Sequence, residues 1–373
     1  MLPAFEKLGV PADLIQGLED LKFVTPTQIQ EKAIPFLIED GGDFIAQAQT
    51  GTGKTAAFGL PLITKMDPTY DKIQGLVIAP TRELAKQIGK HLFRFTKYCE
   101  KKIFVETLTG GDPIDRQIAA LSRPTQIVVA TPGRLIDLMR RKALTLWGVE
   151  HLVLDEADEM LNMGFKKELS QVFDLTKKRT STWLFSATIP DVIDILIKDC
   201  MKPGAHLVKI DQGHVVNRDI DHRYFICKLE DKVEFITDYL RSKRGERGLL
   251  FCRTISDSKH LCRKLTALGF SVGLLQGDLD QRERDKVMRG FKKERFQYLV
   301  ATDVAARGID VEGLSFVIHH QLSDQTDHYT HRSGRTARAG KKGVSIALIT
   351  QREKQRISGL EKDLKVRFKE FGQ

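Results

Sequence analysis

Short apolar runs alternate along the chain with segments in which apolar residues recur at helical spacing. The runs are rich in β-branched and aromatic residues and are apolar on both faces, which is typical of buried parallel strands. In the N-terminal half the pattern predicts strands at Asp43–Ala48, Gly75–Ala79, Gln126–Ala130, His151–Asp155 and Thr182–Ser186. It predicts intervening helices at Thr55–Lys65, Arg82–Cys99 and Pro113–Leu121. This alternation builds βαβ units with right-handed crossovers.

The same pattern starts again in the C-terminal half, after Pro203-Gly204. It predicts strands at Tyr224–Cys227, Gly248–Cys252, Val272–Gln276, Tyr298–Thr302, Phe316–His319 and Val344–Thr350. The helices predicted between them are Asp231–Arg241, Ser256–Leu268 and Arg282–Phe291. Residues 203–218 are polar and rich in turn formers, so we expect a linker there and a domain boundary near residue 210. The expected fold is α/β, with two tandem domains at 1–210 and 211–373, each a mostly parallel sheet flanked by helices.

Composition excludes several classes of protein. The chain has 373 residues, of which 41% are hydrophobic and 29% are charged, a balance that excludes a disordered or fibrous protein. No apolar run approaches the roughly 18 residues of a membrane span, and the first residues lack the layout of a secretory signal. The five cysteines are scattered without a CxxC pair, which argues against a disulfide scaffold or structural zinc and suits a cytoplasmic location.

The positive charge is concentrated in the second half of the chain. Residues 1–210 contain 27 Lys and Arg against 26 Asp and Glu, whereas residues 211–373 contain 32 against 23. The excess of nine suggests a polyanionic partner such as nucleic acid, although a solvated basic surface explains it equally well.

A glycine-rich segment lies between the first predicted strand and the helix that follows it. It reads Ala48, Gln49, Thr50, Gly51, Thr52, Gly53, Lys54 and Thr55, which has the context of a P-loop and its pattern except that Ala48 replaces the first glycine. Glycines allow backbone amides to curl around phosphate oxygens, the lysine reaches the β- and γ-phosphates, and the Thr55 hydroxyl can ligate Mg²⁺. The alternative, a glycine-rich turn without function, does not account for Lys54 and Thr55.

Acidic residues follow the predicted strand His151–Asp155. Four apolar strand residues deliver Asp155 to the carboxyl edge of the sheet, where it can hold Mg²⁺ through water. Glu156 comes next and is placed to accept a proton from the attacking water or to orient it. An acidic run after a strand can also cap a helix, but the P-loop predicted at the same edge favours the metal.

Asp155 to Asp158 spell DEAD, and with the P-loop they make the chain resemble a DEAD-box ATP-dependent RNA helicase over nearly its whole length. Further motifs occur in the order and spacing of that family. They are Pro80–Ala85, Gly110-Gly111, Thr131–Arg134, Ser186–Thr188, Gln276–Asp278, Gln281 with Arg284, Ala301–Asp303, Ala306–Asp310 and His331–Arg338. The resemblance implies two RecA-like domains, ATP hydrolysis with Mg²⁺, and RNA as partner, with protein regulators possible and no membrane. It also implies that duplexes are locally unwound, or RNA–protein complexes remodelled, at the expense of ATP.

The segment from Phe23 to Gln30 resembles the adenine-recognising Q motif of the family. The resemblance assigns adenine recognition to Gln30, because one amide offers both a donor and an acceptor to the base. It assigns ring packing to Phe23, for which an ordinary core position is the alternative. Lys22 stands where the family usually has glycine, so the local turn is expected to differ.

The resemblance also assigns residues of the second domain to the nucleotide. It places Arg335 and Arg338 against the γ-phosphate as arginine fingers, and Gly308 and Asp310 near the ribose and nucleotide. Planar guanidinium groups suit the charge that spreads over the transferring phosphoryl oxygens. A spacing of three would put both arginines on one face if that stretch is helical. Ser186 and Thr188 are expected either to couple the DEAD loop to domain closure or to cap a helix.

The residues expected to bind RNA are of types that contact phosphate and sugar rather than base edges, so binding should be largely independent of sequence. They are Thr81, Arg82, Gly110, Gly111, Thr131, Gly133, Arg134, Arg253, Thr254, Gln276, Gly277, Arg284 and Thr302.

The chain departs from the family pattern after the strand predicted at Phe316–His319. Gln321 and Ser323 stand where the family typically has Asp-x-Pro, which puts the adenine contact from this domain in doubt. The pair His319-His320 is not expected to bind metal, because adjacent strand residues face opposite sides and no third ligand is nearby in sequence.

Besides an RNA-dependent ATPase, two other functions stay open: an ATP-gated RNA clamp with slow turnover, and a DNA translocase of the wider superfamily.

Overall fold

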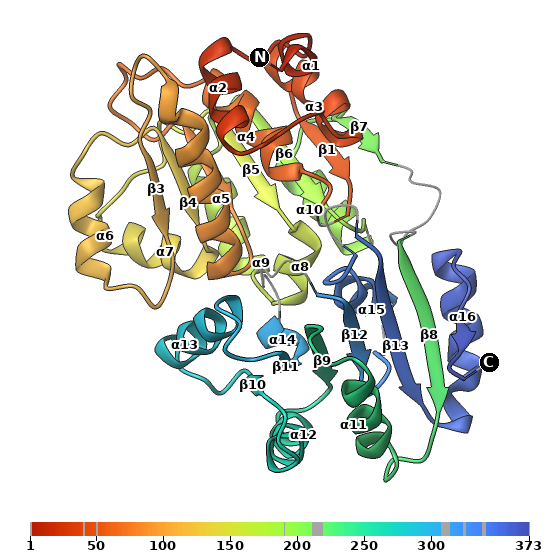
Figure 1. Ribbon diagram of the computed structural model, residues 1–373. Coiled ribbons are helices and arrows are strands. Elements are labelled where there is room, and N and C mark those ends of the chain that lie inside the picture. The colour runs from red at the N-terminus through yellow and green to blue at the C-terminus, as the bar shows by residue number, and fades with distance from the viewer. Residues whose placement is uncertain are drawn as a thin grey trace. The chain divides into compact units, whose positions relative to one another are not determined.

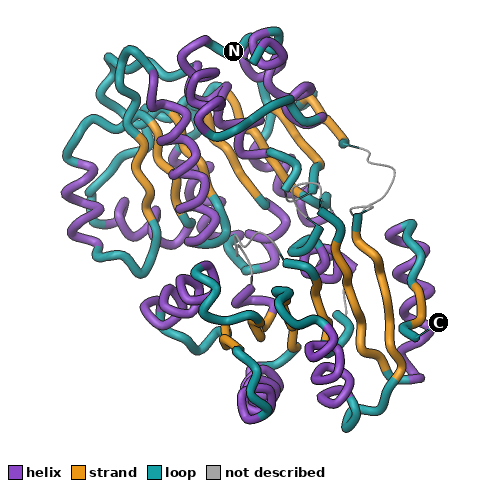
Figure 2. Tube along the Cα trace, viewed as in Figure 1, coloured by secondary structure: helices purple, strands orange, loops and turns teal. Residues whose placement is uncertain are grey.

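The computed structural model describes residues 2–39, 42–49, 51–189, 191–210, 219–306, 314–323, 326–337 and 341–372. The chain divides into two compact units, Met1–Ile210 and Asp211–Gln373, which are described separately below. In each unit the described strands form one parallel sheet with helices packed against it (Figure 1, Figure 2). The predicted α/β fold with two mostly parallel sheets is therefore confirmed.

Unit 1 contains a seven-stranded sheet in the order β3-β4-β2-β5-β6-β1-β7 among the described residues. Its strands are β1 (Phe44–Gln47), β2 (Gly75–Ile78), β3 (Val105–Leu108), β4 (Ile127–Ala130), β5 (His151–Asp155), β6 (Ser181–Ser186) and β7 (His206–Lys209). The central strands are buried on both faces, and their side chains alternate between two cores. On β2, for example, Val77 belongs to one core and Leu76 and Ile78 to the other.

The helices of unit 1 cover both faces of this sheet. Those contributing to the core that contains Val77 are α1 (Pro3–Glu6), α2 (Ala12–Asp20), α3 (Gln28–Glu39), α4 (Lys54–Thr64) and α5 (Arg82–Phe95). A 3₁₀ turn at Thr96–Tyr98 follows α5. Those packed against the other core are α6 (Ile114–Leu121), α7 (Pro132–Arg140), α8 (Ala157–Asn162), α9 (Lys166–Leu175) and α10 (Asp191–Cys200).

Unit 2 repeats this architecture with the strand order β10-β11-β9-β12-β13-β8-β14. Its strands are β8 (Ile220–Ile226), β9 (Gly248–Cys252), β10 (Val272–Leu275), β11 (Tyr298–Thr302), β12 (Phe316–His319), β13 (Gly343–Ile349) and β14 (Lys369–Glu370). Its helices are α11 (Lys232–Ser242), α12 (Ile255–Ala267), α13 (Gln281–Lys292), α14 (Asp303–Ala306), α15 (Thr326–Ser333) and α16 (Lys354–Leu364), with a 3₁₀ turn at Gln351–Glu353. Position by position, β8 corresponds to β1 and β12 to β5.

The sequence prediction was wrong or incomplete at the borders of the sheets. β7 lies within residues 203–218, which were predicted to be a polar linker, and β3 and β14 were not predicted. β8 begins at Ile220, four residues before the predicted start at Tyr224. All three missed strands are the outermost of their sheets, so each pairs on one side and buries few side chains. An edge strand therefore lacks the apolar run by which the central strands are recognised.

Among the described helices, none has the length and apolar character needed to cross a lipid bilayer.

Candidate functional site

The carboxyl ends of the strands carry the site residues, and the sheet order of unit 1 sorts them into two groups. Because all strands of this sheet are parallel, their carboxyl ends lie along one edge. The P-loop follows β1, the DEAD residues follow β5, and Ser186 ends β6, so these three lie on neighbouring strands. The loops expected to bind RNA follow the other neighbouring strands, β2, β3 and β4. One half of the edge thus holds the nucleotide candidates and the other half the RNA candidates.

The P-loop joins β1 to α4 by a tight backbone turn. Gly51 and Gly53 have φ of 83° and 90°, in the left-handed region that favours glycine. Lys54 is the first residue of α4, and its buried ammonium group donates to the Ala48 carbonyl at 2.9 Å. The Thr52 hydroxyl donates to the Gln49 carbonyl at 2.7 Å. The loop is thus held in shape by its own side chains, while Thr50 lies outside the described residues.

Asp155 ends β5 as a buried carboxyl group beside the P-loop. Burial raises its pKa to about 7, the Lys54 ammonium opposes this rise, and the Glu156 carboxylate adds to it. Its Oδ1 accepts a hydrogen bond from the Glu156 amide at 3.0 Å. A buried carboxylate stays ionised more readily when a cation approaches it, and Asp155 with the half-buried Thr55 offers the oxygen donors that Mg²⁺ prefers. The donor chemistry of these residues therefore fits a magnesium ion.

Glu156 has an unusual backbone for its residue type. Its φ and ψ are both 53°, a left-handed conformation that costs a residue with a side chain about 1–2 kcal/mol. The conformation turns the chain sharply between β5 and α8. Strain of this kind is often found at functional positions, where the surrounding structure enforces it.

The last residue of the DEAD sequence connects β5 to the segment after β6. The Asp158 amide donates to Ser186 Oγ at 3.2 Å, and the amide and hydroxyl of Thr188 donate to Asp158 Oδ2 at 3.1 and 3.0 Å. Asp158 lies in the first turn of α8, so Ser186 Oγ satisfies an amide at the amino end of that helix and also joins the DEAD loop to the end of β6. Of the two alternatives weighed for Ser186 and Thr188, helix capping and coupling, both stay predictions.

Gln30 is buried between the Q motif and the P-loop. Its Nε2 donates to the Gly53 carbonyl at 3.0 Å, and its Oε1 accepts from the Thr27 amide at 3.0 Å. The Thr27 hydroxyl adds a bond to the Thr52 carbonyl at 2.7 Å. Each end of the Gln30 amide thus has one partner within the protein, and each keeps the capacity for one further hydrogen bond.

Phe23 packs inside unit 1. Its ring lies edge-on to Phe5 and Phe95, with centroids 6.1 and 6.2 Å away. It is only partly buried, so a part of the ring can still meet a ligand. The ring thus packs against the core of unit 1 and also has exposed surface, so ring packing against adenine stays a prediction beside the core alternative.

Two of the RNA candidates after β2 and β3 contact each other. Thr81 is the N-cap of α5, where its hydroxyl accepts from the Leu84 amide at 3.2 Å. The Arg82 guanidinium lies so close to Gly110 that a Cβ there would approach it to 2.8 Å. Gly111 adopts a φ of 82°. Gly110, which has no Cβ, thus leaves room for the Arg82 side chain.

The candidates after β4 begin a helix. Thr131 occupies the N-cap position of α7 and Gly133 lies in its first turn, where a Cβ would meet open space. The same turn carries Arg134, whose Nη1 donates to the Asp112 carbonyl at 3.1 Å and to Gln117 Oε1 at 2.7 Å. Arg134 therefore braces the loop after β3 with this nitrogen.

Unit 2 presents the corresponding loops after β9, β10 and β11, which are neighbours in its sheet. Thr254 is the N-cap of α12 and accepts from the Asp257 amide at 3.0 Å, as Thr81 does for α5. The Arg253 amide donates to Gln321 Oε1 and Gln321 Nε2 donates to Asp257 Oδ2, both at 3.0 Å. Gln321, which departs from the family pattern, thus ties β12 to the loop after β9.

The remaining RNA candidates of unit 2 differ in exposure. Gln276 is buried, and its Oε1 accepts no hydrogen bond from any described residue. Gly277 is exposed beside it, Thr302 is buried at the end of β11, and Arg284 is half-buried on α13.

The expected arginine fingers follow α15, which ends at Ser333. Arg335 lies in a turn, where its amide donates to the Arg332 carbonyl at 3.1 Å, and Ala337 has a φ of 55°. The helical spacing considered for Arg335 and Arg338 is therefore wrong for Arg335, because the turn ends the helix first. Arg338, Gly308 and Asp310 lie outside the described residues.

Arg332 fixes the segment before Arg335, a function that the sequence did not reveal. It is almost fully buried, and its guanidinium forms two bonds with the Asp303 carboxylate, one of 2.6 Å from Nη2 and one of 2.5 Å from Nε. Both residues belong to motifs quoted above, so the sequence marked each of them. It did not mark their pairing, because they are 29 positions apart and no local pattern links them.

His319 has a structural environment. It is fully buried at the end of β12, its Nε2 lies 3.0 Å from Ser345 Oγ, and burial lowers its pKa. The described residues contain no group of three or more His, Cys, Asp or Glu side chains suited to a metal. Magnesium, which takes few protein ligands, needs no such group.

Comparison with protein families gives two matches that together span both units. Residues 27–196 match the family described as DEAD/DEAH box helicase, and residues 231–340 match the helicase conserved C-terminal domain.

Individual proteins extend the likeness to nearly the whole chain. The DEAD-box ATP-dependent RNA helicase CshA of Bacillus cereus is 40% identical over 364 residues, which cover 98% of this chain and 69% of the relative. A structure of Dbp5 from S. cerevisiae bound to RNA and ADP BeF3 has a TM-score of 0.89 and 33% identity, and covers 98% of this chain and 95% of that one. A DEAD box protein from Methanococcus jannaschii has a TM-score of 0.56 and 38% identity, with 99% of each chain covered.

Proposed function

The chain belongs to the DEAD-box family of ATP-dependent RNA helicases, and from this membership we propose how its own residues divide the work. Its two parallel sheets are RecA-like domains, and it is an RNA-dependent ATPase that couples ATP hydrolysis to work on RNA. We propose 1–210 and 211–373 as the domain bounds. The observation that carries the assignment of the site is the hydrogen-bonded set at the edge of unit 1, which joins the P-loop to Gln30 and the DEAD loop to Thr188.

Nucleotide binding is proposed for the P-loop and the Q motif. Backbone amides of Ala48 to Gly53 would surround the phosphates, and the Lys54 ammonium would leave the Ala48 carbonyl for the β- and γ-phosphates. Gln30 would offer its second amide hydrogen and the second lone pair of Oε1 to the adenine edge while its bonds to Gly53 and Thr27 hold it in place. Because Gln30 touches the P-loop directly, filling the adenine site would be felt at the phosphate site.

Magnesium is the proposed cofactor, held by Asp155 through water and by the Thr55 hydroxyl. When bound with ATP it would offset charge on the phosphates and on the buried Asp155 carboxylate. The residues of this chain supply the oxygen donors and the dry surroundings.

Catalysis is proposed for Glu156 with Arg335 and Arg338. Glu156 would orient the attacking water and accept its proton. Its left-handed backbone conformation sets the direction of its Cα–Cβ bond. The arginines would stabilise charge on the transferring phosphoryl group, and Gly308 and Asp310 would meet the ribose. The Arg332–Asp303 pair would hold the segment that leads to Arg335.

Coupling between hydrolysis and RNA is proposed for Ser186 and Thr188. Both are bonded to Asp158, three residues after the proposed metal ligand Asp155, so a shift of the DEAD loop must move them. The segment they occupy follows β6, the strand between β5 and β1.

RNA binding is proposed for the loops after β2, β3 and β4 of unit 1 and after β9, β10 and β11 of unit 2. Thr81 and Thr254 begin helices, whose amino ends favour phosphate. The exposed Gly133 and Gly277 would let backbone amides approach the RNA closely. Contacts of these types predict little dependence on base sequence.

We propose a cytoplasmic location because all five cysteines are free thiols.

ATP turnover with and without single-stranded RNA, for the wild type and Glu156→Gln, tests this function. We expect RNA to stimulate the wild type, and Glu156→Gln to bind ATP and RNA but to hydrolyse about 10²–10⁴-fold more slowly, because an amide cannot accept the proton. Turnover near the wild-type value would place the base elsewhere. A stable ATP-dependent RNA complex with slow turnover would favour the clamp, and equal stimulation by DNA would favour the translocase.

A further inference from the structure

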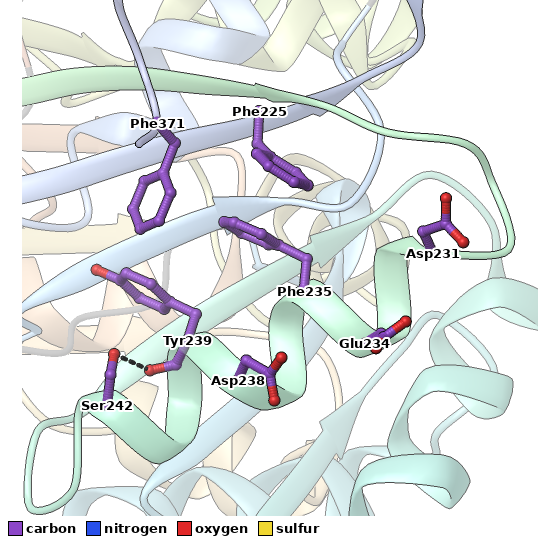
Figure 3. A pocket seen from close by; sticks show the side chains of 8 residues that line it. All are labelled: Phe225, Asp231, Glu234, Phe235, Asp238, Tyr239, Ser242 and Phe371. Carbon is purple, nitrogen blue, oxygen red and sulfur yellow. Dashed lines mark hydrogen bonds between the residues drawn. The ribbon is translucent and has the colours of Figure 1, made fainter. Parts of the chain in front are cut away.

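A cavity of about 510 Å³ lies on unit 2 between α11, the end of β8 and the residues after β14 (Figure 3). None of the residues that line it belongs to the nucleotide or RNA set. The volume falls within the range of pockets that hold a small ligand or a few side chains. The roles proposed for the nucleotide and RNA residues therefore do not account for this cavity.

One side of the cavity is a cluster of four aromatic rings. Phe225 stacks on Phe235 with centroids 4.2 Å apart, and Phe371 meets Phe235 and Tyr239 edge-on at 5.1 and 5.7 Å. In Figure 3 the rings come from β8, from α11, which follows it in the sequence, and from the distant Phe371 near the end of the chain, and they turn toward a common space. Phe225, Phe235 and Phe371 remain half-exposed, although they continue the core under α11.

The other side of the cavity is acidic. Asp231, Glu234 and Asp238 are all exposed and follow one side of α11 in Figure 3. Asp238 forms an ion pair with Arg241 at 3.4 Å, whereas Asp231 and Glu234 form none with any described residue. Phe235 and Tyr239 lie four residues apart on one face of α11, and Glu234 and Asp238 lie four residues apart on the next face, so a row of rings runs beside a row of carboxylates.

These carboxylates contrast with the charge of their surroundings. Residues 211–373 contain 32 Lys and Arg against 23 Asp and Glu, so an acidic patch runs against the balance of the unit. RNA phosphates and anionic lipids would be repelled here. A cation would be attracted both by the carboxylates and by the negative faces of the rings.

We propose that this cavity is a docking site for a basic segment of a partner protein, which inserts an arginine side chain flanked by an apolar one. Arginine fits better than lysine because its planar guanidinium stacks on aromatic rings and bonds a carboxylate with two nitrogens. The apolar neighbour would cover the exposed ring surface of Phe225 and Phe371. The site is independent of the nucleotide proposal, since it shares no residue with it.

Selection of random dodecapeptides displayed on phage, against the full chain, tests the proposal without presuming a sequence. One selection uses the wild type and the other uses the double variant Asp231→Asn, Glu234→Gln. The matched control is Asp71→Asn, Glu100→Gln, which removes the same two charges from exposed positions of unit 1. The most enriched peptide is then synthesised with a fluorescent label, and its affinity is measured by anisotropy.

We expect peptides that combine arginine with apolar residues, and binding about tenfold weaker to the Asp231, Glu234 variant than to the wild type or the control. Phe371→Ala should weaken binding at least as much. If Phe371→Ala does not fold, the double variant Asp231→Asn, Glu234→Gln, which changes exposed residues, still tests the proposal. The proposal is overturned if no peptide is enriched, if enriched peptides are neutral or acidic, or if they bind the double variant equally well. Competition by a single-stranded RNA for the labelled peptide at the wild-type cavity would also overturn it, because it would make the patch part of the RNA surface.

Discussion

Lys54 and Lys232 occupy the same place in the two units. Each is the first residue of the helix that follows the strand next to the outermost strand, β1 in unit 1 and β8 in unit 2. Both side chains are buried. Lys54 donates to one carbonyl of its own loop, that of Ala48. Lys232 instead donates to the His320 carbonyl, just after β12, at 2.7 Å and to the Leu348 carbonyl, near the end of β13, at 2.9 Å.

The loops before the two lysines explain the difference. In unit 1 the loop contains Gly51 and Gly53 in left-handed conformations, so its amides can surround an anion. In unit 2 the corresponding residues 227–231 read CKLED, with two acids and no glycine. Unit 1 thus carries the lysine that we propose to bind phosphate, and unit 2 carries a lysine whose ammonium cross-links the ends of β12 and β13. The fold supplies the position, and the loop decides the chemistry.

The strongest test of this comparison replaces each lysine by methionine and measures ATP turnover with saturating RNA. We expect Lys54→Met to lower turnover about 10²–10³-fold, because it removes a donor aimed at the charge that develops on the phosphates. Lys232→Met should leave turnover of the folded protein roughly unchanged. A similar loss in both variants would show that the second lysine also serves the nucleotide.

Stability should respond in the opposite way. We expect Lys232→Met to lower the free energy of unfolding by about 2–3 kcal/mol, because two carbonyls lose a charged donor. Burial also lowers the pKa of Lys232, so part of the loss is offset by a desolvation cost that methionine avoids. Urea unfolding followed by circular dichroism measures the change. Lys228→Met is the matched control, an exposed lysine of the same loop, and an equal effect there would refute the cross-link.

How far the sequence sufficed differs between local and distant features. The central strands and the P-loop were predictable because each is a continuous run of residues whose pattern follows directly from its environment. The Gln30–Gly53, Arg332–Asp303 and Thr188–Asp158 bonds join residues 23, 29 and 30 positions apart, and nothing local signals them. The cavity at Phe371 likewise needed β14, an edge strand of two residues without a recognisable apolar run.

Acid should destabilise unit 2 more than unit 1. Burial lowers the pKa of His222 to about 4 and also lowers the pKa of His319 and His320 in unit 2, whereas in the described part of unit 1 it does so for His151, to about 4. A histidine kept neutral by the fold takes up its proton on unfolding, so stability is complete above pH 6.5 and declines as the pH falls toward 4. His222 and His151, each with a pKa of about 4, should each cost about 1–2 kcal/mol by pH 5, and His319 and His320 add to the loss in unit 2.

The two units can be followed separately in this experiment because both tryptophans, Trp147 and Trp183, lie in unit 1. Tryptophan fluorescence reports the unfolding of unit 1, and circular dichroism reports both units. The unfolding of unit 2 is the transition seen by circular dichroism but not by fluorescence. Between pH 7 and pH 5 we expect the free energy of unfolding to fall more for this transition than for that of unit 1. His222→Gln should remove part of that excess. Equal pH dependence of both transitions would contradict the assignment.

The smallest expected effect concerns a turn that both units share. Lys22 and Glu294 each follow a helix, α2 and α13, with φ of 59° and 58°. The amide of the next residue, Phe23 or Arg295, reaches back five residues to Leu18 or Gly290 at 3.1 and 2.9 Å, which makes both ends Schellman motifs. The turn before Phe23 is therefore the left-handed one that glycine favours, and the different turn expected from Lys22 is wrong.

Because a side chain in this conformation costs about 1–2 kcal/mol, and glycine gives part of that back as chain entropy, Lys22→Gly should raise the free energy of unfolding by about 0.5–1 kcal/mol. Glu294→Gly should gain less, since Glu294 also pairs with Arg247 at 3.6 Å. Thermal unfolding of both variants, with Lys22→Ala and Glu294→Ala as controls that keep a Cβ, measures the difference. ATP turnover of Lys22→Gly should stay at the wild-type value, because the bond that positions Phe23 is retained. A lower free energy of unfolding for Lys22→Gly would contradict this. It would mean that contacts of the Lys22 side chain stabilise the turn by more than the left-handed backbone costs.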